Sequence, residues 1–396
     1  MVSDRSDGAA GDVVAWLLRI SHDLPPADLA GAVGEALAVL GARSSCIYLV
    51  DHDHRTLHPD TPAGAEAESV AVDGTTGGRA FSLERTVVVS NHTTSRVWLP
   101  MIDGTARLGV ILVEMAGEAV DDDTVEDLEE VASLAAELYI TKSQYTDAIE
   151  QVRRHRPMSL SAELQRANLP PVALVTPRVA VAGMLLPAYE VAGDSFDYAL
   201  NAQSLHLAVI DSVGHEVESS LVSHLVQGCL RNSRRAGLDL PGAYAMADAA
   251  VARVFPDMRF ATAAFGDLDL DSGRFAWVSA GHPPPLLMRS GKVIGEVPTV
   301  PVAPIGLGGK DPVVNHVDLE PGDSLVVYTD GVTEGGVRGG ERFGLDRLAD
   351  LLARVMVEGL PPAERVRRLV NAVLEHSAHE LRDDTTVVLV QLGERE

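Results

Sequence analysis

Residues 206–218 read HLAVIDSVGHEVE, an apolar segment that stops at Asp211 and continues into a glycine-containing turn and an acidic, helix-like stretch. A short run of apolar residues bounded by turn residues predicts a buried β-strand. A carboxylate at the end of such a strand is costly to bury unless it is paired, binds a cation or serves the turn. The role of Asp211 therefore depends on whether other acidic residues meet it.

Other predicted strands also begin or end in acidic residues. Each of these aspartates alone could serve only a turn, since Asp is a common turn residue. Carboxylates that converge repel one another unless a cation neutralises them, and oxygen ligands suit Mg²⁺ or Mn²⁺. Two such ions about 4 Å apart can activate a water and hold a phosphoryl oxygen. The acids are Asp194 in VAGDSFDYAL, Asp330 in DSLVVYTDG, and Asp383 and Asp384 in RDDTTVVLV.

The composition excludes several classes of partner. The 396 residues include 57 acidic and 32 basic side chains, a formal net charge of −25. Nucleic acids and anionic membranes both bind through Lys and Arg, so neither is expected as a partner. No stretch approaches the roughly 18 apolar residues of a membrane span, and the N-terminus lacks the pattern of a signal peptide. With only two cysteines, the chain is expected in a reducing cytoplasm.

Residues 10–120 are expected to form one α/β domain. Helical segments at about 12–22 and 27–41 precede a strand, SSCIYLVD, and a later hairpin turns at Asp103-Gly104. The segments GGRAF and WLPMIDG…RLGVILV resemble those of GAF domains. This resemblance implies a small-molecule sensor domain without naming its ligand.

Residues 121–170 are expected to form signalling or linker helices. Apolar residues between Asp121 and Arg154 recur at a three-four spacing that is typical of a short heptad seam. The seam either packs on the preceding sheet or joins two copies of the chain into a homodimer through residues 121–155. Its members are Val131, Leu134, Leu138, Tyr145, Ala148 and Val152.

Residues 171–394 are rich in predicted strands interrupted by helices, which indicates stacked antiparallel sheets covered by helices. The whole chain is thus expected to be of the α/β (α+β) class. Six motifs in order resemble metal-dependent (PPM) serine/threonine phosphatases of the stage II sporulation and stress-response branch. That resemblance implies an α-β-β-α sandwich. The motifs are VAGDSFDYAL, IDSVGHE, AGHPPPLLMR, PIGLG, YTDGVTEG and RDDTTVVLV.

The resemblance also implies a set of metal ligands and catalytic residues. Asp211 corresponds to the acid that bridges two Mn²⁺ or Mg²⁺ ions, and Ser212 contributes its main-chain carbonyl. Asp384 ranks below its neighbour as a ligand. The implied catalytic acids are Asp194, Asp211 and Asp330, and the implied metal ligands are Asp194, Asp211, Ser212, Asp330, Asp383 and Asp384.

The implied function is hydrolysis of a phosphoserine or phosphothreonine on a protein by a metal-bound hydroxide. In this branch the substrate is an anti-sigma-factor antagonist with a STAS fold, and the N-terminal domain would regulate the phosphatase. Two positions depart from the family pattern: Ala192 replaces a glycine, and Glu216 replaces the glycine after His215. The alternative is therefore a weak or inactive phosphatase-fold scaffold that binds a phosphoprotein or a sigma-factor regulator.

Overall fold

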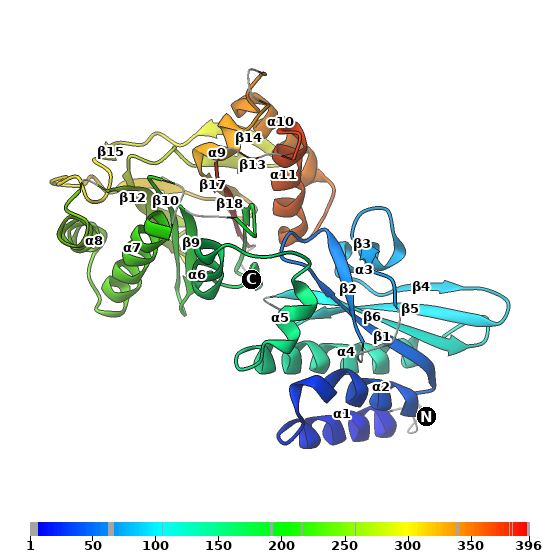
Figure 1. The fold of residues 1–396 in the computed structure, drawn as a ribbon. Helices are drawn as coiled ribbons and strands as arrows, with labels where there is room; N and C mark the ends of the chain where they lie inside the picture. Colours follow the sequence, from blue (N-terminus) through cyan, green and yellow to red (C-terminus); the bar gives the residue numbers. More distant parts are fainter. Residues whose placement is uncertain are drawn as a thin grey trace. The chain divides into compact units, whose positions relative to one another are not determined.

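A computed structural model describes residues 7–61, 67–104, 106–190, 193–214, 217–257, 259–337, 340–379, 381 and 383–393. The chain divides into two compact units, Met1–Pro157 and Met158–Glu396, and each is described by itself (Figure 1). Ala192, His215 and Glu216 lie outside the described residues. The two departures from the family pattern therefore have no structural description.

The N-terminal unit is a six-stranded antiparallel sheet with helices. The strand order is β3-β2-β1-β6-β5-β4. The predicted hairpin at Asp103-Gly104 is confirmed, because β5 and β6 pair on either side of it. The elements are α1 (Asp7–Ser21), η1 (Pro26–Asp28), α2 (Leu29–Val39), β1 (Ala42–Val50), β2 (Thr56–Asp60), β3 (Val70–Ala71), α3 (Thr76–Leu83), β4 (Val87–Ser90), β5 (Thr94–Ile102), β6 (Arg107–Ala116), α4 (Asp122–Ser143) and α5 (Ala148–Arg153).

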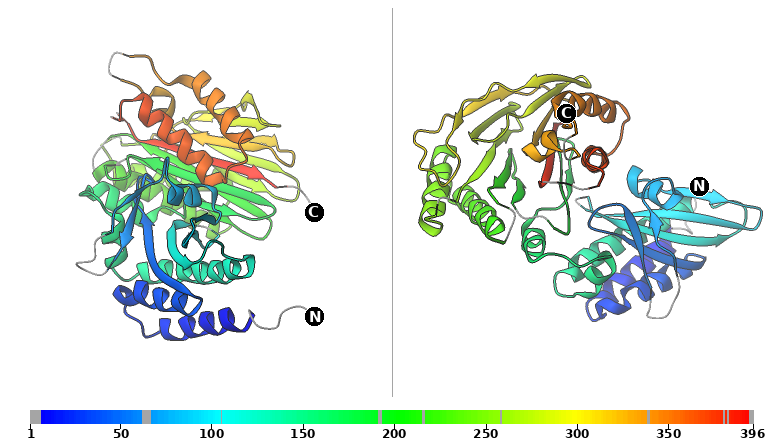
Figure 2. Two further views of the ribbon diagram at one scale, coloured as in Figure 1. Left: turned by 90° about the vertical axis from the view of Figure 1, so that its right-hand side faces the viewer. Right: turned by 45° about the horizontal axis from the view of Figure 1, so that its top comes forward.

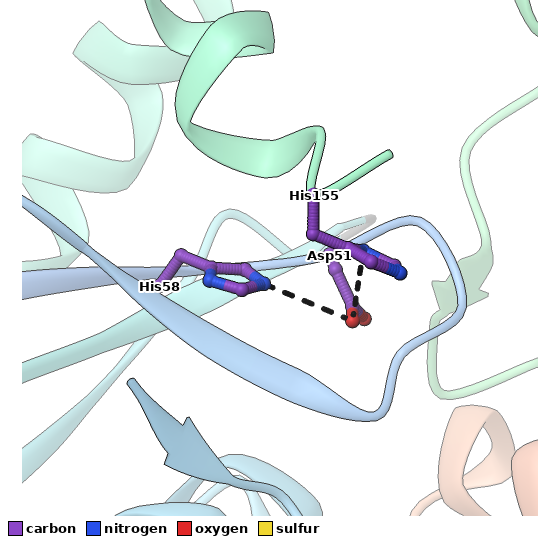
Figure 3. Close-up of side chains that lie close together, drawn as sticks. All are labelled: Asp51, His58 and His155. Atoms are coloured by element: carbon purple, nitrogen blue, oxygen red, sulfur yellow. Dashed lines mark ion pairs between the residues drawn. The ribbon is translucent and has the colours of Figure 1, made fainter. Parts of the chain in front are cut away.

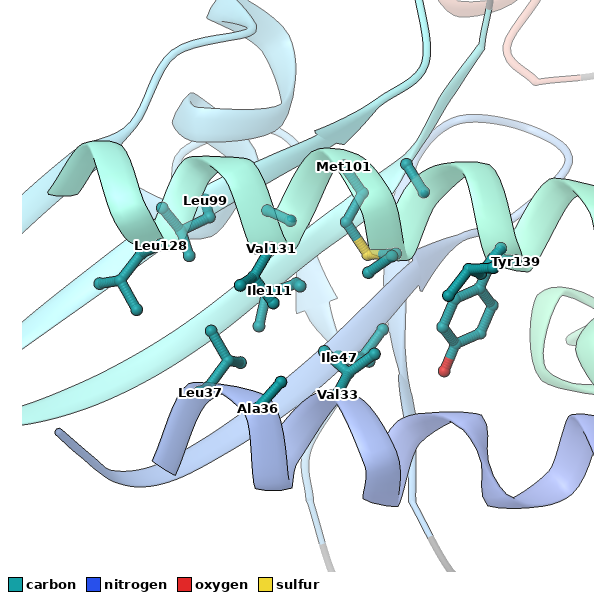
Figure 4. Close-up of a cluster of buried hydrophobic side chains, with 14 of the residues drawn as sticks. Val33, Ala36, Leu37, Ile47, Leu99, Met101, Ile111, Leu128, Val131 and Tyr139 are labelled. Carbon is teal, nitrogen blue, oxygen red and sulfur yellow. The ribbon is translucent and has the colours of Figure 1, made fainter. Parts of the chain in front are cut away.

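Helix α4 packs on this sheet. It begins where the Asp121 side chain accepts a hydrogen bond from the Thr124 N–H, a standard N-cap. Val131 of the heptad seam is buried in the core shared with α2 and the sheet (Figure 4), and Leu138 belongs to the same core. The seam is also interrupted, because α4 ends at Ser143 and α5 starts only at Ala148. Of the two alternatives for this helix, the structure favours packing within the unit.

The C-terminal unit contains two six-stranded sheets and the remaining helices. One sheet runs β15-β12-β11-β10-β9, with β16 also paired to β12, and the other runs β14-β13-β17-β18-β8-β7. The elements are α6 (Leu160–Asn168), β7 (Ala173–Val175), β8 (Val179–Leu186), β9 (Asp194–Leu200), β10 (Ser204–Ser212), α7 (Val217–Arg235), α8 (Leu240–Val254), β11 (Ala261–Asp269), β12 (Arg274–Ala280), β13 (Leu286–Arg289), β14 (Lys292–Glu296), β15 (Pro301–Val302), β16 (Asn315–Asp318), β17 (Ser324–Tyr328), α9 (Asp330–Glu334), α10 (Gly344–Val357), α11 (Pro362–His376) and β18 (Thr385–Leu392).

The two sheets form the inner layers of an α-β-β-α sandwich, as expected from the sequence. Apolar side chains of β8, β17 and β18 meet those of β9 to β12 in a central core. A second core joins α7 and α8 to the outer face of β10–β12, and a third joins α10 and α11 to the other sheet. Figure 2 shows these helices on opposite sides of the paired sheets. Ends of strands from different sheets thus lie at one edge of the sandwich.

Among the described helices, none is both long and apolar enough to cross a membrane. Both cysteines, Cys46 and Cys229, are free thiols.

Candidate active site

The first two predicted acids lie on neighbouring strands. Asp194 begins β9, Asp211 is close to the end of β10, and the antiparallel register places the two directly opposite each other. Asp194 is buried with 2% of its surface exposed, whereas Asp211 is partly exposed. The Ser212 carbonyl lies beside Gly193, where a Cβ atom would stand only 2.5 Å from it. A glycine at 193 therefore lets the two strands approach closely at the site.

The remaining acids come from the other sheet. Asp330 lies two residues after β17 and opens α9, while Asp383 and Asp384 directly precede the neighbouring strand β18. One carboxylate oxygen of Asp384 accepts the main-chain N–H groups of Gly193 and Asp194, at 2.7 and 3.1 Å. This carboxylate thus joins the edges of the two sheets. Asp330 and Asp383 are the exposed members of the group.

These carboxylates are close enough to raise one another's pKa values. Burial and the charges of Asp211 and Asp384 raise the pKa of Asp194 well above its usual range. Burial, followed by the charges of Asp330, Asp383 and Asp384, raises the pKa of Asp211 to about 7. Burial and the Asp383 charge also raise the pKa of Asp330. The predicted convergence of the acids is therefore present among the described residues, and negative charge accumulates where it occurs.

The buried acid Asp194 is held by residues that the sequence did not single out. One of its carboxylate oxygens accepts hydrogen bonds from the Thr329 and Thr386 hydroxyls, at 2.7 and 2.6 Å. The Thr329 hydroxyl also accepts the Thr386 N–H, at 3.0 Å, which ties β17 to β18. The Gln165 side chain in α6 donates to the Asp194 carbonyl, at 2.5 Å. The two threonine bonds orient the Asp194 carboxylate, and both go to Oδ2, not to Oδ1.

Asp211 is positioned by a shorter chain of polar groups. The Thr262 hydroxyl, opposite Asp211 on β11, hydrogen-bonds to its carboxylate. Nδ1 of His282 lies 3.1 Å from the same hydroxyl, and the two bonds are compatible when His282 donates to Thr262 and the Thr262 O–H donates to Asp211. His282 is buried, and that burial lowers its pKa to about 4. His282 of the AGHPPPLL loop therefore contacts Asp211 only through Thr262.

The hydroxyl that Thr386 donates to Asp194 can be tested by an isosteric replacement. We expect Thr386→Val to lower the stability of the C-terminal unit by about 1–3 kcal/mol, because a buried carboxylate loses a donor. Thr385→Val is the matched control, since its hydroxyl is buried without a hydrogen-bond partner among the described residues. Denaturant unfolding of both variants measures the difference. Equal unfolding curves for the two valine variants would show that the Thr386–Asp194 bond contributes nothing.

The sequence of this unit matches a known family. Residues 201–393 match the family of stage II sporulation protein E (SpoIIE). The C-terminal unit therefore contains a region that is similar to the SpoIIE family and is called the SpoIIE-type domain below. The predicted resemblance to PPM-type phosphatases is thereby confirmed for this unit, whereas the GAF resemblance of the N-terminal unit stays a prediction.

Individual relatives support the same assignment of the SpoIIE-type domain. The phosphoserine phosphatase RsbU of Bacillus subtilis is 21% identical over 226 residues, which span 53% of this chain and 62% of that protein. Protein IcfG of Synechocystis is 30% identical over 93 residues, spanning 24% of this chain and 15% of IcfG. A solved structure of the RsbU and RsbW domains of Rv1364c from Mycobacterium tuberculosis is 29% identical, covers 56% of this chain and 63% of that one, and has a TM-score of 0.50. The chain thus matches less than two thirds of each of these three proteins.

The carboxylate cluster of the SpoIIE-type domain fits divalent cations. Its donors are oxygens, which hard ions such as Mg²⁺ and Mn²⁺ prefer. Among the described groups, the charges that shift the pKa of Asp194 and Asp211 all come from other carboxylates. A cation would relieve this repulsion. Asp211 is opposite Asp194 in the strand register, and the charge of Asp330 raises its pKa. The ligands expected from the sequence stay a prediction, and Asp384 accepts hydrogen bonds from the main chain of residues 193 and 194.

Proposed function

We propose that this protein is a metal-dependent serine/threonine phosphoprotein phosphatase. The observation that carries the proposal is the convergence of carboxylates from two sheets at one edge of the sandwich. Asp194 and Asp211 come from one sheet, and Asp330, Asp383 and Asp384 come from the other. The SpoIIE-family match and the similarity to a phosphoserine phosphatase support the same chemistry.

The arrangement suggests a division of labour among the acids. Bound Mn²⁺ or Mg²⁺, in a pair, would supply an activated water and neutralise the phosphoryl oxygens. Asp194, held by two threonine hydroxyls, would be one ligand of these ions. Asp211 and the Ser212 carbonyl would be further ligands. The exposed Asp330 and Asp383 would face the incoming phosphoester, so the substrate would enter from their side.

The substrate we propose is a phosphorylated regulatory protein of the anti-sigma-factor antagonist type, with a STAS fold. The similarity to RsbU and to the RsbU and RsbW domains of Rv1364c supports this choice. The exposed position of Asp330 and Asp383 is compatible with a phosphorylated side chain on a folded partner. A cytoplasmic location follows from the same proposal. A homodimer through residues 121–155 is not included, because Val131 and Leu138 are buried within the N-terminal unit.

The proposal is tested with phosphopeptides of one sequence that carry phosphoserine, phosphothreonine or phosphotyrosine. In the presence of Mn²⁺, phosphate release from the first two is expected to exceed release from the third by at least tenfold. Asp211→Asn is the inactive control, and Asp271→Asn, at an exposed turn, is the matched active control. Binding of the phosphoserine peptide without any hydrolysis would instead support the scaffold alternative.

Regulation by the N-terminal unit leads to a separate prediction. Residues 158–396 contain their own cores, so this fragment is expected to fold alone. If residues 1–157 regulate the phosphatase, the fragment and the full chain will differ in kcat or in the Mn²⁺ concentration for half-maximal rate, by about threefold or more. Identical kinetics in a side-by-side titration of Mn²⁺ would show that the N-terminal unit does not regulate the isolated enzyme.

A further inference from the structure

A second group of potential metal ligands lies in the N-terminal unit, apart from the acidic site. Asp51 directly follows β1, His58 lies in β2, and His155 follows the end of α5. Their side chains point toward one another (Figure 3). Nε2 of His58 and Nδ1 of His155 lie 4.0 and 3.6 Å from the same oxygen of Asp51. One ligand atom from each of the three residues fits within a span of 4.8 Å.

The other polar atoms of these side chains are engaged elsewhere. The second Asp51 oxygen accepts the Arg55 N–H, at 2.8 Å. Nδ1 of His58 lies 3.0 Å from the Ser69 hydroxyl, so a proton on Nδ1 leaves the lone pair of Nε2 facing Asp51. Nε2 of His155 faces the Asp53 carboxylate, at 3.8 Å. Histidine ligands commonly have a hydrogen-bond partner on the opposite ring nitrogen, as His58 has in Ser69, and this partner sets the tautomer.

The inward-facing atoms lie at ion-pair distances from one another rather than at hydrogen-bond distances. Distances of 3.6 and 4.0 Å are too long for hydrogen bonds. Nε2 of His58 is buried and has no hydrogen-bond partner among the described residues. Burial, the largest influence, lowers the pKa of His58. Ligands around a tetrahedral Zn²⁺ with bonds near 2 Å are about 3.3 Å apart, so a small contraction would close the group around an ion.

We propose that Asp51, His58 and His155 bind a divalent transition-metal ion of the Zn²⁺ class. Two imidazole nitrogens and one carboxylate favour Zn²⁺ over Mg²⁺, which prefers oxygen ligands only. Three protein ligands leave a further coordination position for water or another ligand. The site would fasten the chain just after α5 to the turn between β1 and β2. Because His155 lies three residues before Met158, metal binding would order the segment that leads into the C-terminal unit.

The test is calorimetric titration of the full chain with Zn²⁺ in excess Mg²⁺, which competes for the all-oxygen acidic site. We expect His58→Ala and His155→Ala each to weaken Zn²⁺ binding by about 100-fold or more. His92→Ala is the matched control, because His92 is fully exposed in the same unit. Co²⁺ provides a second readout: its visible absorption should report nitrogen ligation in the wild type and in His92→Ala, and should be lost in the other two variants.

Circular dichroism tests whether each variant is folded. We expect both histidine variants to fold, because the His58 and His155 side chains are partly exposed. Zn²⁺ affinity that is unchanged in both His58→Ala and His155→Ala would overturn the proposal. Zn²⁺ binding that disappears only in Asp211→Asn would also overturn it, because the ion would then occupy the acidic site. The readout is independent of phosphatase activity, so failure of the proposed function leaves this result interpretable.

Discussion

Asp211→Asn is expected to lower metal-dependent phosphoester hydrolysis by about 10³-fold or more, since about 4 kcal/mol of transition-state stabilisation is lost with a bridging ligand. Asp211 lies opposite Asp194 in the register of β9 and β10, and Asp330 and Asp383 also contribute to its raised pKa. A carboxamide keeps the size of the side chain but removes the charge that would hold two cations. The measurement is kcat with an aryl phosphate at saturating Mn²⁺.

Asp271→Asn is the control for this variant. Asp271 is also an aspartate at a turn, but it is exposed and pairs with Arg178 rather than with the acidic cluster. We expect its kcat to stay within about twofold of the wild type, as is usual for surface substitutions. If Asp211→Asn retained more than a tenth of the activity, Asp211 would not bridge the reacting ions.

The metal-free protein is expected to become more stable when Asp211 is replaced by Asn. Burial and three neighbouring carboxylates raise the pKa of Asp211 to about 7, from an ordinary value of 3.8. The folded state therefore binds a proton that the unfolded state has already lost, and metal-free stability falls as the pH rises from about 4 to about 7. At pH 8 in chelator, we expect Asp211→Asn to unfold with a free energy about 1–4 kcal/mol larger than that of the wild type.

Adding Mn²⁺ should reverse this order. An ion that binds only the folded state stabilises it by mass action, so the wild type should gain several degrees in Tm. Asp211→Asn should gain much less, because it lacks a ligand. The melting transition of the C-terminal unit, followed with and without Mn²⁺, measures both effects. A wild-type Tm that does not respond to Mn²⁺ or Mg²⁺ would contradict a cation site at the acidic cluster.

The acids of the site could be predicted from the sequence because each one interrupts an apolar run. Asp211, Asp330 and Asp383 stand where a buried strand begins or ends, and such positions are visible in a single sequence. Their convergence is a property of strand order, which brings β9 and β10 of one sheet to the edge shared with β17 and β18 of the other. In the sequence, this convergence could be expected only because the order of the motifs resembles that of a known family.

The residues that orient the acids could not be found in the same way. Thr329 and Thr386 are adjacent to predicted motifs, but a threonine beside a strand carries no local sign of a partner 135 or 192 residues away. Gln165 lies in a short helix whose contact with Asp194 depends on packing. His58 and His155 are likewise brought together with Asp51 only by the fold, since they are separated by β3 to α5.

Helix boundaries show a similar limit. The sequence of residues 345–377 has a helical pattern throughout, whereas the structure contains two helices there, α10 and α11. Gly359 has a φ of 66°, a left-handed conformation that ends the first helix, and Pro361 then precedes the second. Gly and Pro are known helix-breaking residues, but the apolar periodicity continues on both sides of them and therefore does not mark the boundary.

Phosphate release from a generic aryl phosphate by the full chain, compared in Mn²⁺, Mg²⁺ and chelator, tests the proposed chemistry most directly. We predict release with either ion or with Mn²⁺ alone, none in chelator, and none from Asp211→Asn. Release that continued in chelator, or that Asp211→Asn performed as fast as the wild type, would contradict hydrolysis at the carboxylate cluster.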